Sequence, residues 1–247
     1  HTVQAFDLDD FDEVMTWLHD LHHSVADTVE IVALTKTDRT LSDRPVLLVT
    51  GVALVSDEAE AEAALAPFRS NPALDRALLV VDAAPTTLEK ERARQLVDNP
   101  EGHRWAVDNA WLSGPVEQVL PAMRRAYTTL PNDKAFTIWF SMAPLRRLPD
   151  MAFSMQSEIY LASYVPWQDE SDDHSSQAWL REVMIDLQPV TIGQYLGDGD
   201  LSRRQVKFMS DDNWARLREV RAVRDPENLF VGHLAGADGA LNANHWE

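Results

Sequence analysis

The stretch WLHDLHHS contains three histidines, His19, His22 and His23. A spacing of three residues places His19 and His22 on neighbouring turns of a helix, where one metal ion can bridge two imidazoles. His22 borders an apolar stripe, however, and no acidic residue follows at a diagnostic position. Because a metal site needs three or four ligands in the correct geometry, the pattern favours surface or boundary histidines, and we predict no metal site.

Two acidic stretches, DESDDH at 169–174 and GDGDLS at 197–202, contain oxygen ligands of the kind that calcium binds. Neither has the alternating ligands and terminal glutamate of the calcium-binding loop, so both are typical of solvated turns. The chain also lacks the glycine fingerprints of phosphate-binding loops and the G-x-S-x-G nucleophile elbow. It has no cysteine, which excludes thiol nucleophiles, disulfides, zinc–thiolate sites and iron–sulfur clusters.

Aromatic side chains offer a different chemistry. The chain has four tyrosines, which are Tyr127, Tyr160, Tyr164 and Tyr195. A tyrosine acts as a general base only if its pKa falls well below its usual value of about 10. A half-buried, hydrogen-bonded hydroxyl is the commoner role for any one of them. Four of the eight tryptophans fall on or near expected strands, where they can line an aromatic substrate pocket on one sheet face: Trp105, Trp111, Trp139 and Trp167.

The elements that must position these residues follow from hydrophobic periodicity. Alternating or β-branched stretches predict strands at 2–8, 28–37, 44–55 and 76–84, with Gly51 as a candidate bulge. Apolar residues at helical spacing predict a helix over 11–25, and an alanine-rich segment predicts another after residue 56. The order β-α-β-β-α-β is that of a ferredoxin-like element. The predicted fold class is therefore α+β, an antiparallel sheet with helices packed on one face.

The second half of the chain extends this sheet. Strands predicted at 135–144 and 152–167 form a hairpin, while 104–112 is either a strand or a lid. Helices are predicted at 86–98, 115–130 and 177–188, with an acidic loop at 168–176. A last helix begins at Ser210 or Asp211 and ends at Arg224, because Pro226 lacks an N–H and constrains the residue before it. The seam between domains is expected near 190–200.

The net charge and the short apolar runs argue against several classes of binding partner. The net charge of −18 argues against nucleic acid and against anionic membrane surfaces, both of which select basic proteins. Apolar runs such as VLLV at 46–49 are far too short to cross a bilayer.

The stretch NWARLREVRAVRDPENLFVGH resembles the closing segment of the berberine-bridge-enzyme-like FAD-linked oxidases. That family ends on an asparagine-aromatic-x-arginine-leucine helix, followed by Asp-Pro-x-Asn-x-Phe. The corresponding positions here are Asn213, Trp214, Arg216, Leu217, Asp225, Pro226, Asn228 and Phe230. Upstream, IGQYLGDGD is similar to the family's Tyr-x-Asn-Tyr element, with Ile192 and Gln194 in place of the first tyrosine and the asparagine. Met155 and Gln156 stand where the family has His-Arg on a long strand.

The resemblance implies one part of a two-part flavoenzyme. Residues 1–192 are then a substrate (cap) domain, and residues 193–247 are a segment that completes an FAD-binding domain. The N-terminal half of that domain, which binds most of the FAD, is expected to lie outside these 247 residues, either in cis or as a separate chain. The isolated chain is expected to be inactive. The implied reaction transfers a hydride from a small organic substrate to flavin.

The same resemblance implies the site residues. Tyr195 is the first candidate for the catalytic residue that faces flavin and substrate, and Glu158 is the alternative acidic base. Gln194 and Asn228 are the candidate cofactor contacts. The candidate substrate contacts are Gln156, Tyr160 and Trp139.

Two other classes of function stay open. The chain can be a flavin-free binding or regulatory subunit that pairs with a separate FAD chain. It can also be a ferredoxin-like enzyme that is cofactor-poor or uses haem. The haem reading needs a histidine on a pocket-facing helix in the second half, whereas His103, His174, His233 and His245 fall in expected loops or in the tail.

Overall fold

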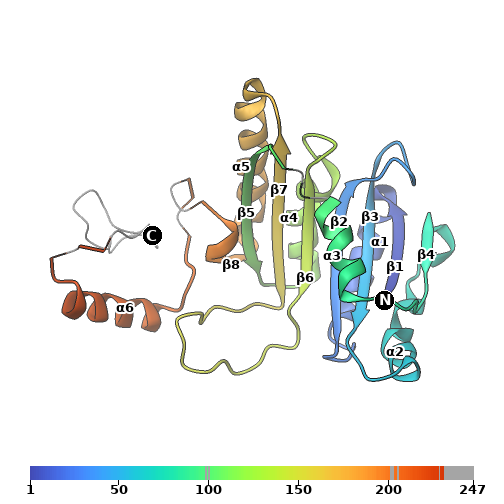
Figure 1. Cartoon of the computed structure of the whole chain (residues 1–247), viewed down its shortest axis with the longest axis horizontal. Helices are drawn as coiled ribbons and strands as arrows, with labels where there is room; N and C mark the ends of the chain where they lie inside the picture. The colour runs from blue at the N-terminus through green and yellow to red at the C-terminus, as the bar shows by residue number, and fades with distance from the viewer. Residues whose placement is uncertain (98, 100, 201–202, 205, 228, 231–247) are drawn as a thin grey trace.

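The computed structural model of the chain describes residues 1–97, 99, 101–200, 203–204, 206–227 and 229–230 (Figure 1). Its centre is one antiparallel sheet of eight strands in the order β4-β1-β3-β2-β6-β7-β5-β8. The strands are β1 (Thr2–Asp7), β2 (Val29–Thr37), β3 (Pro45–Ala53), β4 (Leu79–Val81), β5 (Arg104–Leu112), β6 (Phe136–Ser141), β7 (Ile159–Trp167) and β8 (Thr191–Gly193). The helices are α1 (Phe11–Leu21), α2 (Glu58–Leu65), α3 (Leu88–Val97), α4 (Val116–Thr128), α5 (Asp173–Leu187) and α6 (Asp211–Arg224).

The sheet consists of two halves with the same order of elements. The first half, β1-α1-β2-β3-α2-β4, confirms the predicted ferredoxin-like element, and β5-α4-β6-β7-α5-β8 repeats it. Strands β2 and β6 pair at the junction, where Ala33 lies opposite Trp139. The undecided stretch 104–112 is a strand, β5, which pairs with β7 along its whole length. The predicted α+β fold is therefore confirmed.

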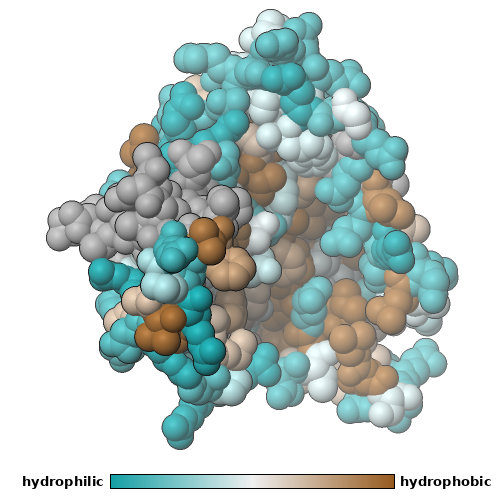
Figure 2. Space-filling view, turned by 60° about the vertical axis from the view of Figure 1, so that its left-hand side comes forward, coloured by the Kyte–Doolittle hydropathy of each residue, from teal (hydrophilic) through white to brown (hydrophobic). Residues whose placement is uncertain are grey.

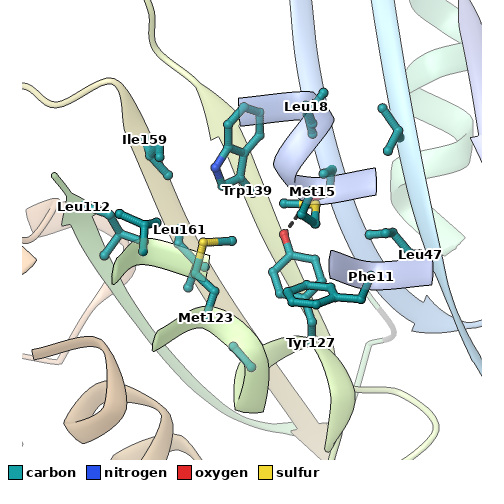
Figure 3. Packing of buried hydrophobic residues seen from close by; sticks show 14 of the residues in the cluster. Phe11, Met15, Leu18, Leu47, Leu112, Met123, Tyr127, Trp139, Ile159 and Leu161 are labelled. Atoms are coloured by element: carbon teal, nitrogen blue, oxygen red, sulfur yellow. Dashed lines mark hydrogen bonds between the residues drawn. The ribbon is translucent and has the colours of Figure 1, made fainter. Parts of the chain in front are cut away.

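The main core lies between the sheet and the helices α1, α4 and α5 (Figure 3). The apolar stripe of α1 enters it through Phe11, Val14 and Leu18, all of which are fully buried. Tyr127 of α4 reaches the sheet from the same side, where its ring packs 5.2 Å from that of Phe11. Helix α3 does not belong to this layer, since it is drawn in front of the sheet in Figure 1. Its Glu91 side chain lies 2.8 Å from Nδ1 of His1 at the N-terminus. No helix among the described residues is both long and apolar enough to cross a membrane.

Three local expectations were wrong. Gly51 is not a bulge, because it keeps its register with Thr2 and Ile31; the ring of Phe68 occupies the space that a Cβ would need. The strand predicted from residue 152 begins only at Ile159. The acidic loop at 168–176 ends early, since Asp173 already opens α5. Carboxylates are favourable at a helix N-terminus, which explains why an acidic run starts a helix there.

The hydroxyl of Tyr127 gives a first test of the core. It is fully buried and donates to the carbonyl oxygen of Ala33 at 3.0 Å. The replacement Tyr127→Phe removes this bond but leaves the ring in place, so the free energy of unfolding should fall by about 1 kcal/mol. Urea unfolding measures the change. An unaltered midpoint would show that the bond contributes nothing to the core.

Candidate functional site

The face of the sheet opposite α1 and α4 carries a cluster of aromatic side chains. Alternate residues of a strand point to opposite faces, so Trp111 on β5 and Tyr160 on β7 leave the main core and meet on this side. Their ring centroids are 4.9 Å apart. Phe136 and Tyr164 stack at 4.8 Å farther along the same face. These strands thus present a continuous aromatic surface.

One carboxylate organises this surface. Asp198 ends a short helical turn, Leu196–Asp198, and its Oδ2 accepts hydrogen bonds from the hydroxyls of Tyr160 at 2.7 Å and Tyr164 at 2.8 Å. Burial raises the pKa of both tyrosines, and the hydrogen bonds to Asp198 raise it further. Both hydroxyls therefore stay protonated at neutral pH and act as donors.

The backbone that carries Tyr195 and Asp198 is fixed to β5 by a buried amide. Asn109 is fully buried, and its Nδ2 donates to the carbonyl oxygens of Tyr195 at 2.9 Å and Asp198 at 2.8 Å. Its Oδ1 accepts from the backbone N–H of Tyr195 at 2.6 Å. Since buried polar groups are costly unless paired, this complete set of bonds determines where the loop runs.

A second anchor holds the same loop at the outer edge of β5. The guanidinium of Arg204 binds both carboxylate oxygens of Asp108, at 2.6 Å through Nε and at 2.5 Å through Nη2. The same Nη2 also donates to the carbonyl oxygen of Asn109 and to Oε1 of Gln194. Bidentate, part-buried pairs of this kind are strong and directional. The loop is therefore tied to β5 before and after Asp198.

Two buried donors in this region have no hydrogen-bond partner among the described residues. They are Nε1 of Trp111 and Nε2 of Gln194, and each lies in a side chain that is at least nine-tenths buried. Unpaired buried donors are rare in folded proteins and ask for an explanation. Each donor is therefore a candidate contact for an acceptor atom of a bound molecule.

The predicted site residues divide into two groups. The first group lies together: the ring of Tyr195 meets that of Tyr160 edge-on, with centroids 6.2 Å apart. Gln194 directly precedes Tyr195 in the chain. Tyr195 is 40% exposed on the surface of the cluster. Asn228, the other candidate cofactor contact, lies outside the described residues.

The remaining candidates lie elsewhere. Glu158 was expected as a buried carboxylate on the long strand, but it precedes β7, its side chain is 43% exposed and it approaches His23 at 3.7 Å. Gln156 also precedes the strand, and its amide donates to the carbonyl oxygen of Arg146 at 2.6 Å. Trp139 is buried in the main core with its ring 5.4 Å from that of His22.

The four strand tryptophans do not share one face, contrary to expectation. Trp139 and Trp167 belong to the core under the helices, whereas Trp111 belongs to the aromatic cluster. Trp105 lines a separate cavity of about 1010 Å³ between α5 and the loop after β8. That cavity includes Arg204 and Lys207 but neither the ring cluster nor Tyr195.

Sequence reasoning missed Asp198, Asn109 and Tyr164 as site residues. Asp198 was assigned to a solvated turn, and Asn109 lay in a stretch with no clear alternation. The one available signal was an asparagine in the middle of a strand, where a polar side chain that is buried needs specific partners.

Gly193 lets the loop approach the sheet. A Cβ at this position would stand 2.0 Å from Sδ of Met155 and 2.5 Å from the carbonyl oxygen of Lys207. That carbonyl also accepts from the backbone N–H of Gln194 at 2.8 Å. The replacement Gly193→Ala should therefore displace the start of the loop and destabilise the chain by about 1–3 kcal/mol in urea unfolding. Gly199→Ala is the matched control, because its Cβ would meet nothing closer than 3.5 Å; equal losses for both would contradict this account.

The C-terminal motif builds a helix and its stop. Ser210 caps α6 by accepting from the N–H of Asn213 at 3.2 Å, as expected for the predicted start. After the helix, the buried carboxylate of Asp225 accepts from the backbone N–H groups of Leu229 and Phe230. Pro226 ends the helix, and the Asp225 side chain fixes the backbone that follows it. Trp214 is buried against Phe208, whereas Leu217 and the residues beyond it keep apolar surface exposed.

The chain is similar in sequence to curated FAD-linked oxidoreductases, although no protein-family model matches it. It is 28% identical to the FAD-linked oxidoreductase janO of Penicillium janthinellum over 231 residues, which are 91% of this chain and 50% of the relative. It is 25% identical to ptmO of Penicillium ochrochloron, over 87% of this chain and 48% of the relative. The chain therefore spans about half the length of the curated relatives it matches.

Solved structures show the same fold. The 6-hydroxy-D-nicotine oxidase of Arthrobacter nicotinovorans matches with a TM-score of 0.71 at 15% identity, over 92% of this chain and 52% of that protein. The berberine bridge enzyme of Eschscholzia californica matches with a TM-score of 0.65 at 12% identity, over 97% of this chain and 55% of that protein. In sequence and in fold, the chain is thus similar to one half of the berberine-bridge-enzyme-like FAD-linked oxidoreductases, which confirms the resemblance of its C-terminal segment.

Proposed function

We propose that this chain is the substrate-side half of an FAD-dependent oxidoreductase, and that its aromatic face covers the flavin. The observation that carries the proposal is the arrangement on that face: a carboxylate holds two protonated tyrosines, and a third tyrosine stands exposed beside them. The similarity to FAD-linked oxidoreductases supports the choice of cofactor. It does not favour the flavin-free subunit or the haem enzyme.

The residues present fit a flavin on this face. The isoalloxazine ring is planar and aromatic, and its carbonyl oxygens and ring nitrogens accept hydrogen bonds. Trp111 and Tyr160 offer aromatic surface, and Nε1 of Trp111 and Nε2 of Gln194 are the buried donors that have no acceptor within the described chain. When bound, FAD supplies a two-electron acceptor that takes a hydride from an alcohol, amine or activated C–H and is reoxidised by dioxygen.

The chain's own residues then position the substrate and handle its proton. Tyr195 lies at the exposed edge of the cluster, and we assign to its Oη the role of accepting the proton that leaves with the hydride. Asn109 prevents this backbone from shifting, because it bonds both the N–H and the carbonyl oxygen of Tyr195. Tyr160 and Tyr164 remain hydrogen-bond donors, oriented by Asp198. Asn228 is proposed as a contact on the flavin side.

We also propose that residues 1–192 form the substrate domain and that residues 193–247 complete the FAD-binding domain. Apolar side chains exposed on two neighbouring segments support this division. They are Met142, Leu145, Met151 and Phe153 before β7, and Leu217, Val220, Val223, Leu229 and Phe230 in and after α6. Hydrogen bonds join the two segments, from Asn213 to the carbonyl oxygen of Met151 and from Arg216 to Asp150. Figure 2 shows hydrophobic side chains gathered around a hollow on this side, as expected for a surface that the other half covers.

Flavin reduction tests the proposal. The chain expressed together with an FAD-binding half should purify with flavin absorbance, and an oxidisable alcohol or amine should bleach that absorbance under anaerobic conditions. The 247-residue chain alone, mixed with FAD, should emerge from gel filtration colourless, because most cofactor contacts belong to the other half. A yellow preparation of the chain alone would contradict the division proposed here.

A further inference from the structure

Three histidine side chains converge at the C-terminal end of α1, away from the proposed flavin face. One ring nitrogen from each of His19, His22 and His23 lies within 4.8 Å of the others. The rings of His22 and His23 are closest, with centroids 4.1 Å apart. His19 belongs to the last turn of α1, and the other two follow directly after that helix. The spacing in the sequence places two histidines on neighbouring turns, and the end of the helix brings in the third.

The two ring nitrogens of His22 and His23 have different surroundings. Their Nε2 atoms face each other at 3.1 Å. The opposite nitrogens have polar partners from other segments: Nδ1 of His22 lies 3.2 Å from Oγ of Ser141, and Nδ1 of His23 lies 3.7 Å from Oε1 of Glu158. Metal-binding histidines typically show this pattern, with one nitrogen on the metal and the other oriented by a hydroxyl or carboxylate.

We propose that His19, His22 and His23 bind one divalent transition-metal ion, with zinc as the representative. Imidazole nitrogens suit zinc, copper and nickel. A tetrahedral zinc ion with Zn–N distances of about 2.0–2.1 Å holds its ligand nitrogens about 3.3 Å apart, close to the present separation of the two Nε2 atoms. Small rotations of the His19 and His23 side chains complete the set. Because His23 is 45% exposed, the fourth position is open to water.

Glu158 and Ser141 are positioning residues for this ion. Glu158 orients His23 and partly offsets the positive charge, and Ser141 orients His22, which is 98% buried against Trp139. Ser141 ends β6 and Glu158 precedes β7, so the ion would join the end of α1 to the adjoining ends of these two neighbouring strands. Glu158 would thus orient a metal ligand, which agrees with its position 3.7 Å from His23. The metal site does not depend on the proposed flavin function.

Zinc titration of the intact protein tests the site. After treatment with EDTA and its removal, the protein should take up one zinc per chain in competition with a chromophoric chelator, and its Tm should rise. X-ray absorption at the zinc edge should show three imidazole nitrogens. The result does not require flavin, so it stands or falls separately from the proposed oxidoreductase activity.

Variants identify the ligands. Glu158→Gln should lower zinc affinity by about 10- to 100-fold, and His23→Gln should lower it further because it removes a ligand. His23 is exposed enough for the variant to fold, which circular dichroism verifies. His174→Gln, at an exposed histidine near the start of α5, is the matched control and should bind zinc like the parent. Failure to bind zinc, or equal affinity of the parent and His23→Gln, would overturn the proposal.

Discussion

Replacing Tyr195 by phenylalanine is expected to lower kcat of the complete flavoenzyme by about 10²- to 10⁴-fold. The ring stays against Tyr160 and Phe153, and the backbone stays bound to Asn109, so only the proton-accepting oxygen is lost. KM and flavin content should change little, because neither the aromatic surface nor the buried donors are altered. Steady-state kinetics with the substrate that bleaches the flavin measures the effect.

Tyr127→Phe is the matched control for this experiment. It removes a tyrosine hydroxyl from the same chain, but that hydroxyl lies in the core beneath the sheet and donates to Ala33. It should lower stability without lowering kcat, while Tyr195→Phe should do the reverse. Unchanged turnover in Tyr195→Phe would remove Tyr195 from the proposed chemistry.

The second large effect is expected for Asp198→Ala. The replacement leaves the hydroxyls of Tyr160 and Tyr164 without their acceptor and cuts the tie between the short turn and β7. The free energy of unfolding should fall by about 2 kcal/mol, since each hydroxyl loses a charge-assisted bond but is only part-buried, so water can replace some of it. Loss of positioning at Tyr195 should lower kcat/KM by about 10²-fold.

A double-mutant cycle separates these contributions. If Asp198 acts through Tyr160, then Asp198→Ala and Tyr160→Phe should be non-additive, with a coupling free energy of about 0.5–3 kcal/mol. Asp172→Ala, at an exposed aspartate that precedes α5 and makes no side-chain capping bond to it, should change neither stability nor kinetics. Additive effects of Asp198→Ala and Tyr160→Phe would mean that the two side chains act independently.

Much of the fold could be predicted because its strands have one buried and one partly exposed face. Strand β2, for example, alternates over Ile31, Ala33 and Thr35, and a single sequence shows this pattern. Strand β5 was undecided because both of its faces are covered: Ala110 and Leu112 enter the core, and Trp111 packs into the aromatic cluster. Residues 152–158 were predicted as the start of a strand because apolar residues alternate there. In the structure this segment is irregular, and the strand begins at Ile159.

The candidate site was predictable only where a motif marked it. Tyr195 and Gln194 were found through the tyrosine element, and Tyr160 through its place on a strand. Asp198 and Asn109 were not found, because their roles come from contacts between segments far apart in the chain, such as the bond from Tyr160 to Asp198. The histidine cluster was judged by spacing along one helix, whereas Ser141 and Glu158 come from segments that are distant in the sequence.

Photolabelling with an azido-substituted FAD tests the central claim most directly, namely that the aromatic face of this chain covers the flavin. The analogue, bound to the complete protein with its azide on the isoalloxazine ring, should crosslink peptides that contain Trp111, Tyr160 or Tyr195. Mass spectrometry identifies the labelled residues. Labelling confined to peptides from α1, α4 or α5, on the opposite side of the sheet, would contradict the account.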